Sequence, residues 1–289
     1  MKRILKKMPV VAVLLVGFVI TSCEDEINGR GHGKSFIAGR SVVTVNGVSF
    51  GMIKVKGGTF QMGAPDSDTV AYNLEKPQHI VTLGDFYIAE TEVTQELWQA
   101  VMGSNPSYYN TKGADYPVEN VTWYDCDDFI NRLNALTGKR FRMPTEAEWE
   151  YAARGGRNSR GYRYSGSNCL DDVAWYWKNS GDRYLQGNDS DWKWDTVMNN
   201  NCCTHPVRSK ASNEIGLYDM NGNVWEWCND WCSTYTADAE KNPRGADSGS
   251  VRVVRGGGWY DFERNSRVSQ RGKHNPDYHS NCFGLRIAL

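Results

Sequence analysis

Cysteine and histidine are the residues of this chain that could carry metal or redox chemistry, and their spacing matches no familiar site. Cys228 and Cys232 are separated by three residues, whereas the redox motif has two residues between its cysteines. No histidine lies close to them in the sequence to complete a zinc site. His274 and His279 could bind a metal together with Asp277, but histidines in loops more often face solvent. We therefore expect Cys228 and Cys232 to be structural.

The N-terminus has the features of an export signal. Four basic residues precede an apolar run at 8–20, which is shorter than the roughly 20 residues that span a bilayer. Ile20-Thr21-Ser22-Cys23 resembles a bacterial lipobox, in which the cysteine is lipidated. We expect residues 1–22 to be a lipoprotein signal peptide and Cys23 to carry the lipid. The alternative is an ordinary secretory signal with an incidental cysteine.

The residues after Cys23 bear on the final location. Glu24, Asp25 and Glu26 resemble the acidic export tag of lipoproteins that reach the outer face of the outer membrane, although a short acidic run is also typical of a solvated linker. We expect lipid anchoring to the outer membrane at the cell surface, with the periplasmic face as the alternative. The membrane is contacted only through the lipid. Residues 23–46 are expected to be a tether, and residues 47–289 a single domain.

Charge excludes one class of partner. The net charge is −1, from 33 basic and 34 acidic residues, so no bulk positive field exists for nucleic acid. Seven cysteines remain beyond Cys23, in a compartment where disulfides persist. Because seven is odd, at least one must be a free thiol or pair with another chain.

One helix is predicted strongly by its local signals. Thr122 and Asp125 have the spacing of a capping box, and Gly138 supplies a stop. The pattern predicts a helix over 123–136. Its apolar positions at helical spacing are Cys126, Phe129, Ile130, Leu133 and Leu136.

The other expected elements are short. Cap residues predict two more helices, alternation predicts strands, and Gly, Asn, Asp and Ser with isolated Trp predict loops. The helices are expected from Thr145 through Ala153 and, after the Thr94 cap, over 95–102; the strands at Ile80–Leu83 and Val251–Val254; and the loops from Arg154 to Asn213.

Four sequence blocks, in order and at ordinary spacing, resemble the formylglycine-generating enzymes, also called sulfatase-modifying factors. The resemblance runs from about Val48 to Leu289 and implies an α+β fold, an elaborated C-type-lectin-like domain with little regular secondary structure. The blocks are MIKVKGGTFQMG (52–63), RMPTEAEWEYAARGG (142–156), GLYDMNGNVWEW (216–227) and RVVRGGGW (252–259).

The resemblance also exposes a departure in the reaction pocket. Members of this family bind copper(I) through two cysteine thiolates just beyond a Gly-Gly-Ser segment. Here those positions are Asp261 and Ser266, and the serine of the segment is replaced by Gly258. Oxygen ligands are hard and copper(I) is soft, so we expect no copper site and no catalytic residue. Trp225 matches a pocket tryptophan of the family, but a large ring is equally useful in a core.

Two further expectations come with the resemblance. The block around Asn221 matches the family's calcium-binding turn, which implies carboxylate ligands from Asp219 and Glu226 and carbonyl ligands from Gly222 and Val224. A structural calcium ion is expected there, with an ion-free turn as the alternative. The resemblance also places Cys126 and Cys282 near each other, which offers them as a disulfide.

The last segment combines a retained frame with unusual fillings. The frame RVVRGGGW…RNSRVSQR…NPD…FGLR persists, while Tyr260–Phe262 and Tyr278–Phe283 fill places where relatives often carry asparagine. All nine fillers are reachable from asparagine codons by changing adenines, as in lectin-fold proteins that retroelements diversify. Ordinary drift of a non-catalytic relative is the alternative. We name the expected ligand contacts the ligand face: Trp259, Tyr260, Asp261, Phe262, Tyr278, His279, Asn281 and Phe283.

These observations predict a surface or periplasmic lipoprotein whose non-catalytic domain binds a protein or glycan through the ligand face. Exposed aromatic side chains on a rigid scaffold suit binding because they give contact area at a low entropic cost. Two other classes stay open. One is a divergent oxidoreductase that converts a cysteine of a secreted protein to formylglycine. The other is a structural component of an envelope machine, as in gliding or secretion lipoproteins.

Overall fold

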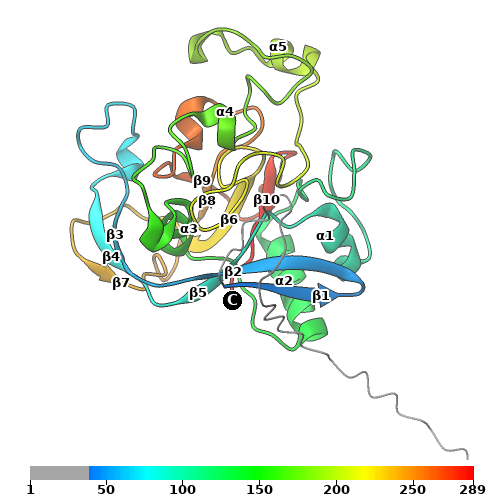
Figure 1. Ribbon diagram of the computed structural model, residues 1–289, viewed down its shortest axis with the longest axis horizontal. Coiled ribbons are helices and arrows are strands. Elements are labelled where there is room, and N and C mark those ends of the chain that lie inside the picture. Colours follow the sequence, from blue (N-terminus) through cyan, green and yellow to red (C-terminus); the bar gives the residue numbers. More distant parts are fainter. Residues whose placement is uncertain (1–38) are drawn as a thin grey trace, which may run out of the picture. The chain divides into compact units, whose positions relative to one another are not determined.

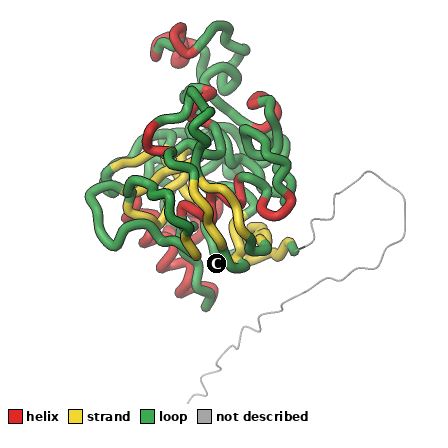
Figure 2. Tube along the Cα trace, turned by 90° about the vertical axis from the view of Figure 1, so that its left-hand side faces the viewer, coloured by secondary structure: helices red, strands yellow, loops and turns green. Residues whose placement is uncertain are grey.

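The computed structural model describes residues 39–289, in which loops outnumber helices and strands (Figure 2). The predicted signal peptide, the lipidation of Cys23 and most of the predicted tether lie outside the described residues. No helix among the described residues is long and apolar enough to cross a bilayer.

The predicted tether, residues 23–46, is wrong for its last residues, because residues 40–45 form a strand of the domain. Strand β1 (Arg40–Val45) pairs along its whole length with β2 (Val48–Val55). The two-residue turn between them is Asn46-Gly47, and both residues have positive φ, as this hairpin turn requires. β5 (Phe86–Ala89) joins β2 on the other side, so the first sheet is antiparallel in the order β1-β2-β5.

The second sheet carries most of the C-terminal segment. Its order is β10-β6-β8-β9, formed by β6 (Trp225–Trp231), β8 (Arg252–Arg255), β9 (Gly272–His274) and β10 (Phe283–Leu285). β10 is parallel to β6, and the other pairs are antiparallel. In the view of Figure 1 this sheet lies near the centre of the domain.

The remaining strands form a third sheet. β3 (Thr59–Met62), β4 (His79–Thr82) and β7 (Glu240–Lys241) form it in that order. The predicted strands at 80–83 and 251–254 are confirmed as β4 and β8, each displaced by one residue.

The three predicted helices are confirmed with their caps. α1 (Gln95–Met102) begins after Thr94, whose side chain accepts a hydrogen bond from the Leu97 backbone N–H. α2 (Trp123–Thr137) has the expected capping box and ends at Gly138, which adopts the left-handed conformation. α3 (Glu146–Ala153) follows Thr145 with a second capping box.

The predicted loop region from 154 to 213 is wrong in detail. It contains two short helices, α4 (Leu170–Val173) and α5 (Trp194–Asn199), together with short 3₁₀ turns at 156–158 and 189–191. Neither helix has a side-chain cap, so the capping signals that located the longer helices were absent.

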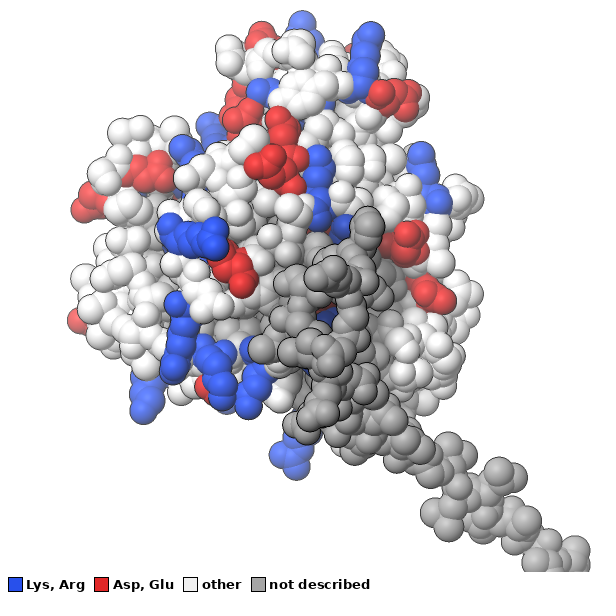
Figure 3. Space-filling model, in the orientation of Figure 1, with Lys and Arg blue, Asp and Glu red and all other residues white. Residues whose placement is uncertain are grey.

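Two apolar cores hold these layers together. One surrounds α1 and α2, where Trp98 and Phe129 stack with ring centres 4.8 Å apart. The other packs α3 against the sheets and contains Trp149. On the face drawn in Figure 3, acidic and basic side chains are scattered among uncharged ones, which agrees with the near-zero net charge.

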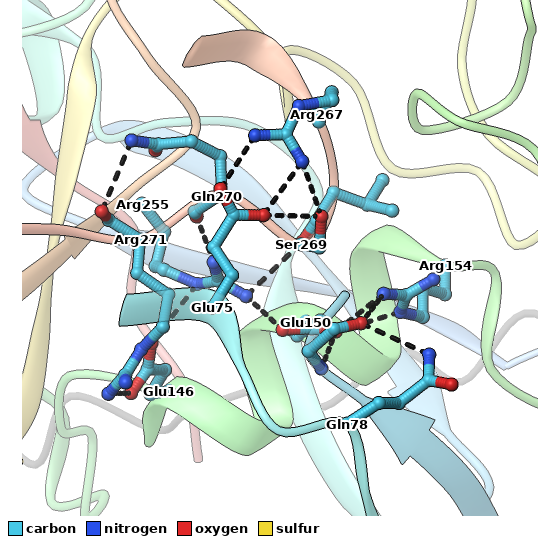
Figure 4. Close-up of polar contacts among 12 residues, drawn as sticks. Glu75, Gln78, Glu146, Glu150, Arg154, Arg255, Arg267, Ser269, Gln270 and Arg271 are labelled. Atoms are coloured by element: carbon cyan, nitrogen blue, oxygen red, sulfur yellow. Dashed lines mark hydrogen bonds and ion pairs between the residues drawn. The ribbon is translucent and has the colours of Figure 1, made fainter. Parts of the chain in front are cut away.

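All eight residues of α3 are buried, including three glutamates. Arg271 binds Glu146 through two hydrogen bonds of 2.6 Å, and Arg255 binds Glu150 (Figure 4). Arg142 binds Glu148 in the same bidentate manner. Buried charges are tolerated only when paired, and removal of one partner is costly. The network therefore joins α3 to the frame of the C-terminal segment.

Candidate functional site

The loop between β8 and β9 contains most of the positions where chemistry is expected. It begins with Gly256 and Gly257, whose φ values of 99° and 83° favour glycine. A Cβ on Gly257 would lie 3.0 Å from the Asn265 carbonyl oxygen, so the turn is also sterically restricted to glycine. The glycines let the chain fold back and place residues 259–266 against the second sheet.

Asp261 organises this loop. Its carboxylate accepts hydrogen bonds from the Gly258 backbone N–H (2.9 Å), the Trp225 indole N–H (2.7 Å) and the Asn265 amide (3.0 Å). Burial raises the pKa of Asp261, while the three hydrogen bonds act to lower it. These three hydrogen bonds stabilise the conformation of the loop and occupy both oxygens of the Asp261 carboxylate.

Ser266 is the second expected thiol position, and it is fully buried. Its hydroxyl oxygen has no hydrogen-bond partner among the described residues. The pocket therefore holds one carboxylate that is already engaged and one buried hydroxyl. Neither atom is a soft ligand.

The segment 256–266 of this loop is held at both ends by the buried ion network of Figure 4. Arg255 stands immediately before it and is fully buried against Glu150. Arg267 stands immediately after it and binds Glu75 through hydrogen bonds of 2.6 and 2.7 Å. The frame residues therefore anchor the two ends of the segment, whereas the filler Asp261 holds its middle.

The structure corrects part of the predicted ligand face. Trp259 and Phe283 are buried, at 0% and 2% exposure, so the expectation that they are exposed is wrong. The Trp259 indole donates to the Asn281 carbonyl, and Phe283 lies 5.1 Å from the Tyr278 ring. These two residues support the face from beneath.

The remaining six residues reach the surface to different degrees. Tyr278 and His279 are exposed, and Tyr278 stacks on His274 with ring centres 4.5 Å apart. His279 contacts the Asn120 side chain at 2.9 Å. The partly buried members are Tyr260, Asp261, Phe262 and Asn281.

Two tryptophans that the sequence did not assign to the ligand face lie against it. The Trp192 indole donates to the Tyr260 carbonyl (3.0 Å), and its ring packs edge-on against Phe262. Trp194 lies 5.6 Å from the Tyr260 ring and is 44% exposed. Isolated tryptophans in a polar loop were the available signal, but only the tertiary fold gives their neighbours.

The predicted Cys126–Cys282 disulfide is wrong. The seven described cysteines are all unpaired. Cys126 is enclosed in the core around α2, while the Cys282 sulfur lies 3.0 Å from the Tyr260 hydroxyl oxygen. Cys228 is fully buried, and burial raises its pKa well above the ordinary value, as expected for a structural thiol. Cys232 is partly buried.

A group of carboxylates surrounds the predicted calcium ligands. Asp219 and Glu226 are buried, and Glu92, which the sequence did not reveal, is buried beside them. Burial, then Asp219 and Glu226, raise the pKa of Glu92 well above its ordinary range. Burial raises the pKa of Asp219 to about 6. Arg286 binds Glu226 at 2.7 Å, whereas Glu92 accepts hydrogen bonds from Asn223 and the Val224 backbone N–H.

The sequence comparisons identify the family. A model of the sulfatase-modifying factor enzyme 1-like domain matches residues 44–289. The chain belongs to this family. The formylglycine-generating enzyme of Streptomyces coelicolor is 31% identical over 82% of this chain and 88% of its own length. The chaperone protein LppX of Paenibacillus barcinonensis is 36% identical over 87% of this chain and 94% of its own length.

Solved structures agree. Treponema denticola variable protein 1 superimposes with a TM-score of 0.74 at 33% identity, covering 86% of this chain and 98% of that chain. The predicted α+β sulfatase-modifying-factor fold, with its low content of regular secondary structure, is confirmed.

The two metals associated with this family fit the residues differently. Copper(I) does not fit, because Asp261 and Ser266 offer only oxygen, and the Asp261 oxygens already accept three hydrogen bonds. Calcium suits the chemistry of the predicted ligands, because Asp219 and Glu226 provide hard oxygens. Both Glu226 oxygens, however, already accept hydrogen bonds from Arg286 or the Trp149 indole. A calcium ion would share Glu226 with Arg286. The calcium site stays a prediction.

Proposed function

We propose that this protein is a lipid-anchored envelope protein whose sulfatase-modifying-factor domain binds a protein or glycan ligand through the ligand face. In this proposal the domain makes no formylglycine. The observation that carries it is the pair Asp261 and Ser266, which replaces two soft ligands by an engaged carboxylate and a buried hydroxyl. In this proposal, loss of the copper ligands removes the oxidation of cysteine but leaves the fold of the domain intact.

The geometry of the ligand face supports binding. Tyr278 and His279 are exposed, partly buried Tyr260 contacts Cys282 of the same C-terminal segment, and Trp194 extends the aromatic surface around Tyr260. Rigid aromatic side chains supply contact area with little loss of entropy. The frame beneath is fixed by buried ion pairs, so exposed residues such as Tyr278 can differ without loss of the fold, whereas Asp261 also holds the loop.

The relatives support the same view. Variable protein 1 of Treponema denticola shares this fold at 33% identity across nearly its whole length. Its name states that it varies, and the fillers of the present chain are concentrated at Tyr260–Phe262 and Tyr278–Phe283. We propose that these two segments form the variable part of the site.

A second candidate function is that of a chaperone. The chaperone protein LppX is 36% identical over 94% of its length. On this proposal the ligand is a protein in the course of folding, and the aromatic ligand face contacts its apolar segments. Anchoring through Cys23 and location at the outer membrane belong to both versions. The formylglycine-forming oxidoreductase and the envelope-machine component remain the alternatives.

The enzymatic alternative is tested first. The soluble chain from residue 24 is incubated with copper(I), oxygen and a Cys-x-Pro-x-Arg peptide, and the peptide mass is followed beside an active formylglycine-generating enzyme. We expect no change of the peptide cysteine. Conversion to formylglycine would refute the proposal.

Binding is tested in the intact lipoprotein on cells. A photo-crosslinking amino acid is placed at Tyr278 or, as the control, at Leu136, which is 43% exposed near the C-terminal end of α2 and outside the ligand face. We expect a discrete crosslinked product from position 278 alone. Equal products from both positions would contradict a ligand site at 278. A set of unfolded client chains would favour the chaperone, whereas one folded protein or glycan would favour specific recognition.

A further inference from the structure

A separate cavity of about 190 Å³ shares no residue with the ligand face. It lies where the end of β6, the first turn of α3 and the loop after β6 meet β3 and β4. Its polar lining includes His79, Glu146, Asp230, Tyr235 and Glu240. Its apolar lining includes Met62, Ala147, Pro243 and Ala246.

Asp230 is the unusual residue of this cavity. It is 3% exposed, and one carboxylate oxygen accepts the Glu146 backbone N–H at 3.0 Å. The other oxygen has no hydrogen-bond partner among residues 39–289 and faces Gly245, where a Cβ would lie 3.2 Å away. Burial, followed by the nearby Glu146 carboxylate, raises the pKa of Asp230 to about 8. Ionised Asp230 would be a buried charge without a cation, which is costly, and a cationic ligand would stabilise this ionised form.

The cationic side chain that lines the cavity, Arg271, is already bound to other groups of the protein. Arg271 gives two hydrogen bonds to Glu146 and two more to the carbonyls of Leu74 and Ser233. His79 donates its Nδ1 proton to the Pro77 carbonyl. Within the described chain, no arginine or lysine forms an ion pair with Asp230 or with Glu240.

A second polar group of the lining is also unsatisfied. The Tyr235 hydroxyl is buried beside Glu146 but makes no hydrogen bond of normal geometry. Its ring is held by Arg271, whose guanidinium carbon lies 3.7 Å from the ring centre, and by His79. The cavity thus has fixed walls and two polar groups that a ligand could use.

We propose that this cavity binds a primary ammonium group, which donates hydrogen bonds to the free oxygen of Asp230 and is also attracted by Glu240 at the rim. A guanidinium suits a carboxylate with two free oxygens, whereas Asp230 offers one, so a compact ammonium is the better match. The described residues contain no group of three acidic, histidine or cysteine side chains arranged for a metal ion. The apolar lining suits the alkyl stem of an amine.

The size of the cavity limits the ligand. A volume of about 190 Å³ corresponds to about six water molecules at about 30 Å³ each. This admits a short alkylamine or the side chain of a lysine, which share the same terminal chemistry. Larger amines would have to leave part of the molecule in solvent.

The test compares n-butylammonium with tetramethylammonium chloride at equal ionic strength, because only the first has N–H donors. We expect n-butylammonium alone to raise the melting temperature of the chain in a saturable manner. Asp230→Asn should weaken this binding by about tenfold or more, as expected for loss of a charge-assisted hydrogen bond. Asp238→Asn, an exposed carboxylate of the same loop, is the matched control and should bind as the wild type does.

A cavity-filling variant covers the case in which Asp230→Asn does not fold. Ala246→Phe retains Asp230 but occupies the cavity, and it should also abolish the response to n-butylammonium. Equal responses to the two salts, or an unchanged response in Ala246→Phe, would overturn the proposal. Nα-acetyl-lysine methylamide then distinguishes the sources. If it competes with n-butylammonium the site accepts a lysine side chain, and if it does not the site takes a free amine.

Discussion

Glu119 offers the sharpest test of the electrostatics beneath the ligand face. It is fully buried; one carboxylate oxygen accepts the Tyr109 backbone N–H at 2.8 Å, and the other has no partner among the described residues. Burial raises the pKa of Glu119 from the ordinary 4.5 to about 7, against the lowering effect of the Tyr109 N–H. Ionised Glu119 is therefore a buried charge without a counter-ion.

The sign of the effect follows from proton binding. The folded state holds the Glu119 proton more tightly than the unfolded state, so this residue's contribution to stability is complete below about pH 4.5 and is lost as pH rises through about 7. The difference between the two pKa values corresponds to a loss of about 3 kcal/mol in the free energy of unfolding. Glutamine has no charge to bury, and its carbonyl can still accept the Tyr109 N–H.

The assay is urea unfolding of wild type and Glu119→Gln at about pH 5 and about pH 8, where the difference between the two proteins isolates this group. We expect the difference to move by about 2.5 kcal/mol in favour of Glu119→Gln at the higher pH, slightly less than the full loss because the unfolded state is already partly ionised at about pH 5. Exposed Glu96, replaced by Gln, is the control and should show no comparable movement. A difference between wild type and Glu119→Gln that stays constant with pH would refute the reasoning.

Three further predictions concern metals and the frame. Replacing both Asp261 and Ser266 by cysteine should let the chain take about one copper(I) ion from a competing chelator, whereas the wild type should take none. A double variant that binds no copper would contradict the assignment of these two positions. Calcium should raise the melting temperature of wild type by a few degrees and that of Asp219→Asn less, as measured by calorimetry, since a ligand at about 100 times its Kd stabilises by about 2.7 kcal/mol. Arg255→Met should cost about 3 kcal/mol in denaturant unfolding because it removes the partner of one buried Glu150 oxygen while Arg154 keeps the other, whereas Phe262→Asn should cost about 1 kcal/mol. Similar costs for these two variants would argue against the division into frame and fillers.

Local sequence signals located the longer elements because their causes are local. Thr122 and Asp125 satisfy the exposed N–H groups of α2, and Gly138 accepts the left-handed conformation that ends it. β1 was missed because its residues alternate weakly, and its pairing depends on β2 and the Asn46-Gly47 turn. α4 and α5 lack caps and are held by their surroundings.

The residues of the candidate site could be predicted from the sequence only where the family resemblance assigns a position to them, because the sequence gives no distances between side chains. The pattern of blocks assigned Asp261 and Ser266 to the former copper pocket, but it gave no sign that Trp225 donates to Asp261. It also assigned Trp259 and Phe283 to the surface. The sequence pattern is the same whether the side chain at such a position points into the core or into solvent. Their burial results from packing of the loop and β10 against the second sheet.

The sequence by itself determined the family and the three capped helices, since each depends on residue identity or on neighbours within a few positions. It also has Asp261 and Ser266 where the family resemblance places the copper thiolates. The tertiary structure alone decided which residues meet across long separations. Arg267 finds Glu75, Trp192 reaches Tyr260, and Asp230 comes to lie beside Glu146. Such contacts depend on how the two cores pack, and burial then shifts the pKa values and leaves individual polar atoms free to bind.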